Sequence, residues 1–320
     1  MKPTQPVVPV ANVGELLAGM ARTGFQGRRL GESVEAWASM IRDPGCTILL
    51  GLSGAMVPAG MGRVLADLAS RNYFDVLVST GANIFHDTCE HLGVRHYQGH
   101  TCADDQELFS RGIDRIHDIF AYEKEFRAVD RRIADFAKGI APFKGSSREF
   151  IDRLGMHLRK EAPQGKSLII TCVEKGIPVF IPALADSSIG IGLVMARREG
   201  AAVEVDQLAD VEEITAMVEG SKRTGVVYVG GGVPKNFIQQ TQVIASIHGQ
   251  DLEGHDYAVQ FTTDAPHWGG LSGCTFDEAV SWGKESPTSQ RVQVFCDATI
   301  ALPIVASALV ARGERRAGRK

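Results

Sequence analysis

The sequence has few features that would favour a disulfide-bonded or zinc-binding protein. Its six cysteines are scattered through 320 residues and none forms a CxxC pair, so neither a disulfide framework nor a zinc site is predicted. None of the nine histidines lies in an HExxH motif or another spacing typical of metal ligands. Cys172 and Cys296 end apolar runs, which favours small buried hydrophobic side chains. We therefore expect no bound metal.

The chain also lacks long apolar segments and an excess of charge of one sign. Prolines interrupt the first ten residues, where a secretory signal needs a continuous apolar region, and no later segment is apolar over the length of a membrane span. The formal net charge of −4 gives no reason to expect nucleic acid or a membrane as a partner. We expect a cytoplasmic protein whose basic C-terminus is solvated and frayed.

What the sequence does contain is an alternation of short apolar segments and longer helical ones. Several apolar segments are hydrophobic at consecutive positions, as expected for strands covered on both faces. Expected strands are residues 47–52, 74–79, 167–171, 177–181, 202–205, 225–229, 257–262 and 291–295, and expected helices include 60–71, 106–138 and 235–248. The alternation predicts an α/β fold with a doubly wound, largely parallel sheet. The charged segment 104–143 is interpreted as a peripheral helical insertion.

Glycine-rich loops follow two of the expected strands. One lies within residues 51–62 and the other is Gly230–Gly232. In parallel sheets ligands bind beyond the carboxyl ends of the strands, where glycine lets the backbone approach a phosphate. The spacing is not GxGxxG, however, and such loops are often simple turns. Two roles remain possible for Asp186 and Asp297, because an aspartate after a strand can accept ribose hydroxyls or cap a helix.

The densest run of reactive residue types is EAVSWGK, residues 278–284. A lysine that attacks a carbonyl or imine carbon must be uncharged, which requires an apolar surrounding or a nearby cation. Trp282 could supply an apolar wall for Lys284 or hold a substrate ammonium against its ring, and Glu278 could bind an amine or move protons. The alternative is a solvated lysine after a glycine that ends a helix.

Six motifs, in this order and spacing, resemble the deoxyhypusine synthase family. They are GCTILLGLSG, DVLVSTGAN, IPVFIPALADSSIG, GGGVPK, DEAVSWGK and DAT.ALP, and together they run from about residue 45 to 309. The resemblance implies a Rossmann-like NAD-binding fold, usually in a homotetramer, in which Lys284 carries an aminobutyl group as an imine. NAD would take a hydride from the polyamine and return it later. The implied organisation is an N-terminal extension (1–40), an NAD-binding domain (41–312) and a basic C-terminal tail (313–320).

Mapped residue by residue, the resemblance implies three groups of site residues. The catalytic group is Lys284, Glu278, Trp282 and Asn236. The cofactor-binding group is Gly54, Ala55, Met56, Thr80, Gly81, Ala82, Asp186, Gly231, Thr263, Asp297 and Ala298. The substrate-binding group is Phe85, His86, Ile191, Trp268, Gly269 and Leu271.

The departures from the family pattern fall mainly on the substrate side. Positions at which typical members carry acids are Phe85, His86, Ile191, Trp268 and Leu271 in this chain, and the position of the catalytic histidine is Asn236. Because those acids hold the ammonium groups of spermidine, we expect a more apolar pocket and a smaller or differently charged donor. Cations would be held by aromatic faces and by Glu278, Asp264 or Asp87.

Three functional interpretations follow. The first is a deoxyhypusine synthase-like transferase that moves an aminobutyl group from a polyamine or diamine to a protein lysine or a free amine. The second is a homospermidine synthase-type enzyme, or another NAD-dependent reaction on putrescine or agmatine. The third is a catalytically silent NAD-binding oligomeric scaffold, against which the retained EAVSWGK segment argues.

Overall fold

A computed structural model describes residues 3–162, 167–250 and 253–318. The chain folds into two compact units, of which the first comprises residues 1–53, 67–78 and 211–320 and the second comprises 54–66 and 79–210. Two helices, α3 (Gly62–Ser70) and α10 (Gln207–Glu219), contain residues of both units. Residues 1–2 of the expected extension and residues 319–320 of the expected tail lie outside the described residues.

The first unit is built on a sheet whose strands lie in the order β11-β10-β9-β1-β2. These strands are β1 (Cys46–Leu52), β2 (Val76–Ser79), β9 (Arg223–Val229), β10 (His255–Thr262) and β11 (Glu285–Phe295). The pairs β1–β9, β9–β10 and β10–β11 are parallel. In β1, the consecutive residues Ile48, Leu49 and Leu50 are all fully buried. This arrangement confirms the expected α/β class and its buried, largely parallel sheet.

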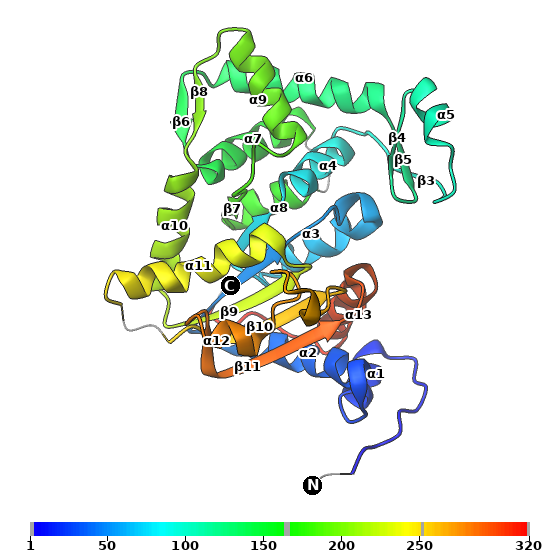
Figure 1. The fold of residues 1–320 in the computed structure, drawn as a ribbon, viewed down its shortest axis with the longest axis vertical. Helices are drawn as coiled ribbons and strands as arrows, with labels where there is room; N and C mark the ends of the chain where they lie inside the picture. Colours follow the sequence, from blue (N-terminus) through cyan, green and yellow to red (C-terminus); the bar gives the residue numbers. More distant parts are fainter. Residues whose placement is uncertain (1–2, 163–166, 251–252, 319–320) are drawn as a thin grey trace. The chain divides into compact units, whose positions relative to one another are not determined.

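Helices cover both faces of this sheet. They are α1 (Val13–Met20), α2 (Phe25–Arg42), α11 (Gly232–Ile247), the short α12 (Phe276–Val280) and α13 (Ala298–Ala311). Helix α2 packs on β10 and β11, whereas α11 packs on β1, and Figure 1 shows the two helices on opposite sides of β9 and β10. Trp37 of α2 is fully buried and donates its Nε1–H to the carbonyl of Tyr73 at 2.9 Å. Helices on both faces of a parallel sheet make the fold doubly wound.

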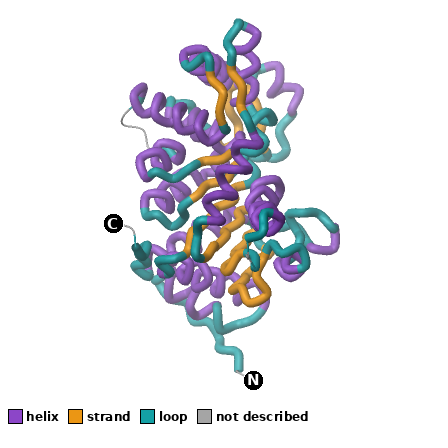
Figure 2. Tube along the Cα trace, turned by 90° about the vertical axis from the view of Figure 1, so that its left-hand side faces the viewer, coloured by secondary structure: helices purple, strands orange, loops and turns teal. Residues whose placement is uncertain are grey.

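The second unit is mainly helical, with short strands between its helices (Figure 2). Its helices are η1 (Val57–Met61), α4 (Gly81–His91), α5 (Asp105–Ser110), α6 (Glu123–Gly139), α7 (Ser147–Glu161), α8 (Leu168–Lys175) and α9 (Ser188–Arg198). Its strands are β3 (Tyr97–Gln98), β4 (Ile113–Ile116), β5 (Ile119–Tyr122), β6 (Phe143–Gly145), β7 (Val179–Phe180) and β8 (Val203–Val205). Helix α4 packs against η1, α6, α8 and α9, so it lies at the centre of this unit.

The prediction of a strand at residues 167–171 is wrong, because this segment begins helix α8 (Leu168–Lys175). The Asp87 carboxylate accepts from the backbone N–H groups of Leu168 at 2.8 Å and Ile169 at 3.0 Å. A short apolar run does not distinguish a buried strand from a buried helix. Here the helix start is stabilised by an aspartate from a distant part of the chain, which local sequence does not reveal.

The segment 106–138 is also not one helix. Strands β4 and β5 form an antiparallel hairpin between α5 and α6, in which Ile116 pairs with Ile119. His117 occupies the turn with a left-handed φ of 55°, as a tight two-residue hairpin turn requires. The peripheral insertion therefore contains two helices and a hairpin, because alternating charges along IDRIHDIFAY suit a solvated hairpin as well as a helix.

The basic tail is not frayed at Arg316, so that part of the expectation was wrong. The Arg316 side chain is 6% exposed and forms an ion pair with Asp75 at 2.7 Å. Its guanidinium also donates to the carbonyls of Met40 and Asp43 at 3.0 and 3.1 Å. A buried acid and backbone carbonyls of folded neighbours, not the local charge pattern, determine where this arginine lies.

Candidate active site

Lys284, the expected carrier of the aminobutyl group, lies where α12 ends and β11 begins. Gly283 has a left-handed φ of 67°, which turns the chain after the helix. The backbone N–H of Lys284 donates to the carbonyl of Ala279 at 3.1 Å, and the Lys284 carbonyl accepts from the N–H of His255 at 3.1 Å. Because both backbone polar groups of the lysine are bonded to neighbouring elements, its Cα position is fixed.

The Lys284 side chain is held by two other members of the expected catalytic group. Its Nζ donates to Asn236 Oδ1 at 3.0 Å, and it lies 5.5 Å from the centre of the Trp282 ring. Asn236 comes from the first turn of α11. The structure thus places Lys284, Trp282 and Asn236 together, while Lys284 is half-buried and Trp282 is 66% exposed. Glu278 lies exposed on α12.

A second lysine, which the sequence analysis did not single out, lies next to Asn236. Lys235 is fully buried, and its Nζ donates to Gln260 Oε1 at 3.0 Å and to the carbonyl of Cys274 at 2.8 Å. Burial lowers the pKa of Lys235 to about 8. Gln260 donates in turn to the carbonyls of Gly230 and Ser272, both at 2.8 Å. This network joins the glycine-rich loop to the segment before α12.

Glu285, directly after the reactive lysine, is a further buried ionisable residue that sequence reasoning missed. Its Oε1 accepts from Gln239 Nε2 at 3.1 Å, and its Oε2 has no hydrogen-bond partner among the described residues. Burial raises the pKa of Glu285 to about 8, although Gln239 and the charge of Lys235 act in the opposite direction. No periodicity or motif distinguishes this glutamate from an exposed one.

Gly231, an expected cofactor-binding residue, lies at the start of α11 in close contact with another loop. A Cβ at this position would lie 2.5 Å from the Cα of Ser272, so no larger residue fits. Ser272 Oγ accepts from the N–H of Gly232 at 2.9 Å, and Ser53 Oγ donates to the carbonyl of Gly231. The glycine therefore lets two polar loops meet at the carboxyl end of β9.

The remaining cofactor candidates of the first unit lie at the ends of β10 and β11. Thr263 is exposed directly after β10. The Asp297 carboxylate accepts from Thr299 N–H at 2.7 Å and Thr299 Oγ1–H at 2.6 Å, and it caps α13, which begins at Ala298. The helix-capping alternative therefore applies to Asp297. Capping leaves the exposed carboxylate able to accept a further hydrogen bond.

In the second unit, the cofactor candidates around Gly54 and Thr80 are joined by hydrogen bonds. The Gly54 carbonyl accepts from Thr80 Oγ1 at 2.7 Å and from Asn83 Nδ2 at 3.2 Å. Asn83, which is fully buried, also accepts from the N–H of Val57 at 3.2 Å. Gly54 itself has a φ of 66° and open space around the position of a Cβ. The loop containing Ala55 and Met56 is thereby tied to the N-terminus of α4, and Asn83 was not predicted to do this.

Gly81 brings two other loops of this unit together. A Cβ on Gly81 would lie 2.3 Å from Ser187 Oγ, so only glycine allows this approach. Asp186 precedes Ser187 and is exposed, and Ala82 is half-buried in the first turn of α4. Gly81, Ala82 and Asp186 are thus neighbours in space as well as in the expected site.

The substrate-binding candidates have contrasting environments. Phe85 and His86 lie on the buried side of α4, at 3% and 8% exposed, whereas Ile191 on α9 is 52% exposed. In the first unit, Trp268 ends the exposed turn η2 (Pro266–Trp268), where its ring packs on His267 at 4.4 Å. Gly269 and Leu271 follow in the same exposed segment.

His86 is the first member of a hydrogen-bonded chain. Its Nδ1 lies 3.0 Å from Nε2 of His96, and Nδ1 of His96 lies 3.1 Å from Glu90 Oε1. Phe126 of α6 packs against both imidazole rings, with ring centres 5.3 and 6.0 Å away. Burial and the neighbouring His96 lower the pKa of His86 to about 4, which keeps this imidazole neutral at physiological pH. Glu90 and His96 were not among the predicted residues.

Asp87 does not hold a substrate cation, contrary to one of our expectations. Its Oδ2 accepts from Ser167 Oγ at 2.6 Å as well as from the N–H of Ile169, and its Oδ1 accepts from that of Leu168. Burial raises the pKa of Asp87 even though these three hydrogen bonds lower it. The carboxylate is therefore buried at the start of α8, with both oxygens bonded there.

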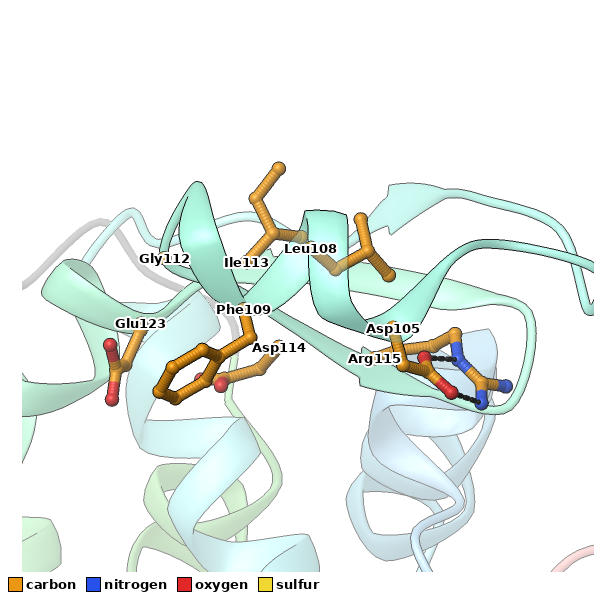
Figure 3. Close-up of a pocket in the computed structure, with 8 residues that line it drawn as sticks. All are labelled: Asp105, Leu108, Phe109, Gly112, Ile113, Asp114, Arg115 and Glu123. Carbon is orange, nitrogen blue, oxygen red and sulfur yellow. Dashed lines mark hydrogen bonds and ion pairs between the residues drawn. The ribbon is translucent and has the colours of Figure 1, made fainter.

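A separate cavity of about 320 Å³ lies between α5 and the β4–β5 hairpin (Figure 3). Figure 3 shows Phe109, Asp114 and Glu123 at one end of the lining residues and Arg115 with Asp105 at the other, where the two pair at 2.6 and 2.7 Å. None of its lining residues belongs to the expected catalytic, cofactor or substrate groups. The cavity is therefore not part of the candidate active site.

The residues expected to hold a cofactor differ between the two units. In the second unit, Gly54 has open space where a Cβ would lie, and its carbonyl accepts from Thr80 Oγ1. In the first unit, the space beside Gly231 is filled by Ser272. Among the described residues, no group of three or more His, Cys, Asp or Glu side chains is placed to bind a metal. Over the same residues, no helix is long and apolar enough to cross a membrane.

The fold places this chain among the doubly wound α/β proteins, with Lys284 held at a strand end. Comparison with known proteins identifies the family. The sequence profile of deoxyhypusine synthase matches residues 15–309. In Methanosarcina mazei, "Probable deoxyhypusine synthase 2" is 59% identical over 308 residues, covering 96% of this chain and 89% of that protein. "Probable deoxyhypusine synthase 1" of the same organism is 39% identical over 310 residues, covering 97% and 94%.

The structural comparison agrees. The crystal structure titled as a "putative deoxyhypusine synthase" from Entamoeba histolytica matches with a TM-score of 0.66 at 18% identity, covering 97% of this chain and 96% of that one. At this identity the likeness shows the fold. Together with the profile match, these relatives show that the chain belongs to the deoxyhypusine synthase family, whose members are transferases of an aminobutyl group.

Proposed function

We propose that this chain is an NAD-dependent transferase that moves an aminobutyl group from a polyamine or diamine to an amine acceptor through an imine on Lys284. The observation that carries the proposal is the position of Lys284 Nζ, 3.0 Å from Asn236 Oδ1 and 5.5 Å from the Trp282 ring centre. A nucleophile held in one place by its neighbours is the arrangement that covalent catalysis needs.

Each neighbour of the lysine has its own task in this proposal. Asn236 Oδ1 accepts a hydrogen from the amine whether it is charged or neutral, so it orients Nζ but cannot take up a proton as histidine does. Trp282 shields one side of the amine from water and offers its ring face to a substrate cation. Glu278, exposed on α12, binds or deprotonates the acceptor amine.

The cofactor proposal takes each unit by itself. In the second unit, the residues proposed to contact NAD are Gly54, Ala55, Met56, Thr80, Gly81, Ala82 and Asp186. In the first unit, they are Gly231, Thr263, Asp297 and Ala298. When bound, NAD would supply the hydride acceptor for amine oxidation and the hydride donor for the final reduction. The observation that supports this assignment is the open space beside Gly54, whose carbonyl is bonded to Thr80. We further propose that the protein works as a homotetramer in the cytoplasm.

We infer that the donor or the acceptor differs from those of deoxyhypusine formation. Phe85, His86, Ile191, Trp268 and Leu271 occupy the positions at which the family has acids. In addition, M. mazei has proteins named for both synthases, and this chain is 59% identical to the second and 39% identical to the first. A second copy in one organism is free to use another amine, and homospermidine-type chemistry or a reaction on putrescine or agmatine fits this site.

The proposal is tested by trapping the imine. Purified protein is incubated with NAD and, separately, with spermidine, putrescine or agmatine, then reduced with borohydride and digested for mass analysis. We expect one donor to give a stable mass increase on Lys284 that requires NAD. An adduct on a different residue, or no adduct with any donor, would contradict the proposal, and the second result would favour a silent scaffold.

A further inference from the structure

The cavity between α5 and the β4–β5 hairpin lies outside the candidate active site, and its lining combines acidic side chains with an aromatic ring. Its volume of about 320 Å³ is at the lower end of the range of about 300–1,000 Å³ that small-molecule sites occupy. Figure 3 shows Phe109, Asp114 and Glu123 together at one end of the lining. All three residues belong to the second unit. The cavity therefore has room for one side chain or one small group.

The two carboxylates at this end are not equally paired. Glu123 forms an ion pair with Arg127, one turn later in α6. The half-buried Asp114 carboxylate has no hydrogen bond or ion pair with a described residue, and its oxygens are not enclosed. Burial and the charge of Glu123 raise the pKa of Asp114, although Arg127 lowers it. A cation beside both carboxylates would therefore be favourable.

Phe109 is the most unusual residue of the lining. Its side chain is 85% exposed, although phenylalanine is among the residues most often buried in protein cores. Its neighbour Leu108 is buried and holds α5 against the hairpin. The face of an aromatic ring attracts a cation that lies within about 6 Å of the ring centre. An exposed ring beside two carboxylates is a combination that can hold an ammonium or guanidinium group.

Two further aromatic side chains extend this surface beyond the cavity. Tyr122 lies directly opposite Ile113, a lining residue, in the antiparallel hairpin, so the two side chains lie on the same face. The ring of Tyr97, in β3, packs on that of Tyr122 with centres 5.5 Å apart, and both tyrosines are exposed. Aromatic side chains are enriched where proteins bind one another. The aromatic surface is thus wider than a single ammonium group needs.

The charge of this surface favours a cationic partner. Residues 97–123 contain six acidic and two basic side chains. Their formal charge of −4 equals that of the whole chain, so the remaining residues are neutral in sum. A nucleic acid or an anionic membrane would be repelled here. Arginine fits better than lysine, because its planar guanidinium can stack on a ring while it pairs with carboxylates.

We propose that residues 97–123 form a docking surface for a basic segment of another protein, from which one arginine enters the cavity. The guanidinium stacks on Phe109 and pairs with Asp114 and Glu123, while apolar groups next to it contact the two exposed tyrosines. None of these residues belongs to the expected catalytic, cofactor or substrate groups. The inference therefore goes beyond the proposed function and does not depend on it.

Fluorescence anisotropy with a labelled peptide tests the docking. The probe is a fluorescein-labelled peptide in which arginine and leucine alternate, and the matched probe carries citrulline, which has the same shape without the charge, in place of arginine. We expect the wild-type protein to bind the arginine peptide at least about tenfold more tightly, the value of a charge-assisted hydrogen bond. Raising the salt concentration from about 0.05 to 0.5 M should weaken this binding, because the charges are partly exposed.

Variants assign the preference for arginine to the cavity. It should fall about fivefold in Asp114→Asn and about threefold in Phe109→Leu, whereas Phe109→Trp should keep or increase it, because tryptophan has the most attractive ring for a cation. The matched controls are Asp152→Asn, at another half-buried aspartate of the second unit, and Phe25→Leu, at an exposed phenylalanine of the first unit. Both controls should bind like the wild type.

The other possible occupants are distinguished by separate outcomes. If spermidine displaces the peptide at an equal or lower concentration, the surface binds free polyamines and the proposal is overturned. If an oligomer dissociates in Phe109→Leu, as measured by analytical ultracentrifugation, the surface is a contact between copies of this chain, which also overturns it. Equal binding of the two peptides, or equal losses in variants and controls, would do the same. The assay contains no NAD or donor amine, so its result is independent of imine formation on Lys284.

Discussion

The surroundings of Lys284 in the first unit and of His86 in the second follow the family motifs to different degrees. Lys284 lies in an intact EAVSWGK segment, with both its backbone groups bonded and its Nζ held by Asn236. The resemblance implies an acid at the position of His86, whose neighbours Phe85 and Phe126 are aromatic. In our proposal, one region keeps the groups that react and the other has neutral rings in place of charge.

This difference separates two requirements of a transferase. Covalent chemistry needs a few atoms at fixed distances, so the residues that place a nucleophile tolerate little change. Binding a donor needs only complementary charge and shape, which several combinations of residues can supply. A family member can therefore keep its reaction while its substrate changes, and the predictions below test each half of that statement.

The largest expected effect concerns the reactive side. Lys284→Arg keeps a positive charge but removes a usable nucleophile, so transfer should fall by at least about a thousandfold. NAD binding, measured as a rise in melting temperature, should remain. Lys222→Arg, at an exposed lysine of the same unit, is the control. If transfer continues in Lys284→Arg, the region around Lys284 does not carry the reaction.

The next effect is on stability beneath the reactive lysine. The folded-state pKa of Glu285 is raised to about 8 by burial, so its carboxyl stays protonated while the unfolded chain ionises. Wild-type stability should therefore decrease as pH rises from about 4.5 to 8, by at most about 5 kcal/mol, since each pKa unit corresponds to about 1.4 kcal/mol. Glu285→Gln should lack this decrease.

Urea unfolding between pH 5 and pH 9 measures this difference. Glu212→Gln, at an exposed glutamate of α10, is the control and should keep the wild-type dependence. Burial lowers the pKa of His255 to about 3, so this residue reduces the stability of the protein only as pH falls below about 6.5. The reduction is equal in wild type, Glu285→Gln and Glu212→Gln. Parallel curves for wild type and Glu285→Gln would show that this carboxyl is not protonated in the folded state.

A smaller effect is expected at Asn236. Asn236→Asp places a carboxylate where Oδ1 now accepts from Lys284 Nζ at 3.0 Å, and an ionised partner favours the charged ammonium over the neutral nucleophile. Transfer at neutral pH should fall about tenfold, and the pH–rate profile should move about one unit towards alkaline pH. Asn236→Leu should lose rate without this displacement. An unchanged profile in Asn236→Asp would show that Asn236 does not contact the reacting amine during turnover.

The smallest effect concerns the binding side. Ile191 is 52% exposed on α9, so Ile191→Asp should restore a family acid with little change in stability. If acids at this position hold spermidine, its affinity should rise about fivefold, as expected for a partly exposed ion pair. Val194→Asp, equally exposed on the same helix, is the matched control. Equal gains in both variants would indicate a general charge effect instead of a restored site.

Much of the candidate site could be predicted because its motifs are contiguous. DEAVSWGK places Lys284 and Trp282 in one turn, and GGGVPK with the following Asn236 begins one helix. Residues that act through distant partners were missed. Lys235 and Glu285 look like ordinary surface charges in the sequence. His96 becomes a neighbour of His86 and Glu90 only because the loop after α4 folds back on that helix.

The sequence by itself determined the α/β class, the parallel strands of the first unit and the positions of the reactive and glycine-rich segments. These follow from local causes, namely runs of consecutive apolar residues and backbone positions that only glycine can occupy. Tertiary structure alone decided that Asp87 stabilises α8, that Arg316 is buried beside Asp75, and that His86 and His96 are hydrogen-bonded to each other. Such roles depend on which polar groups meet once water has been excluded, and a burial pattern in one segment does not contain that information.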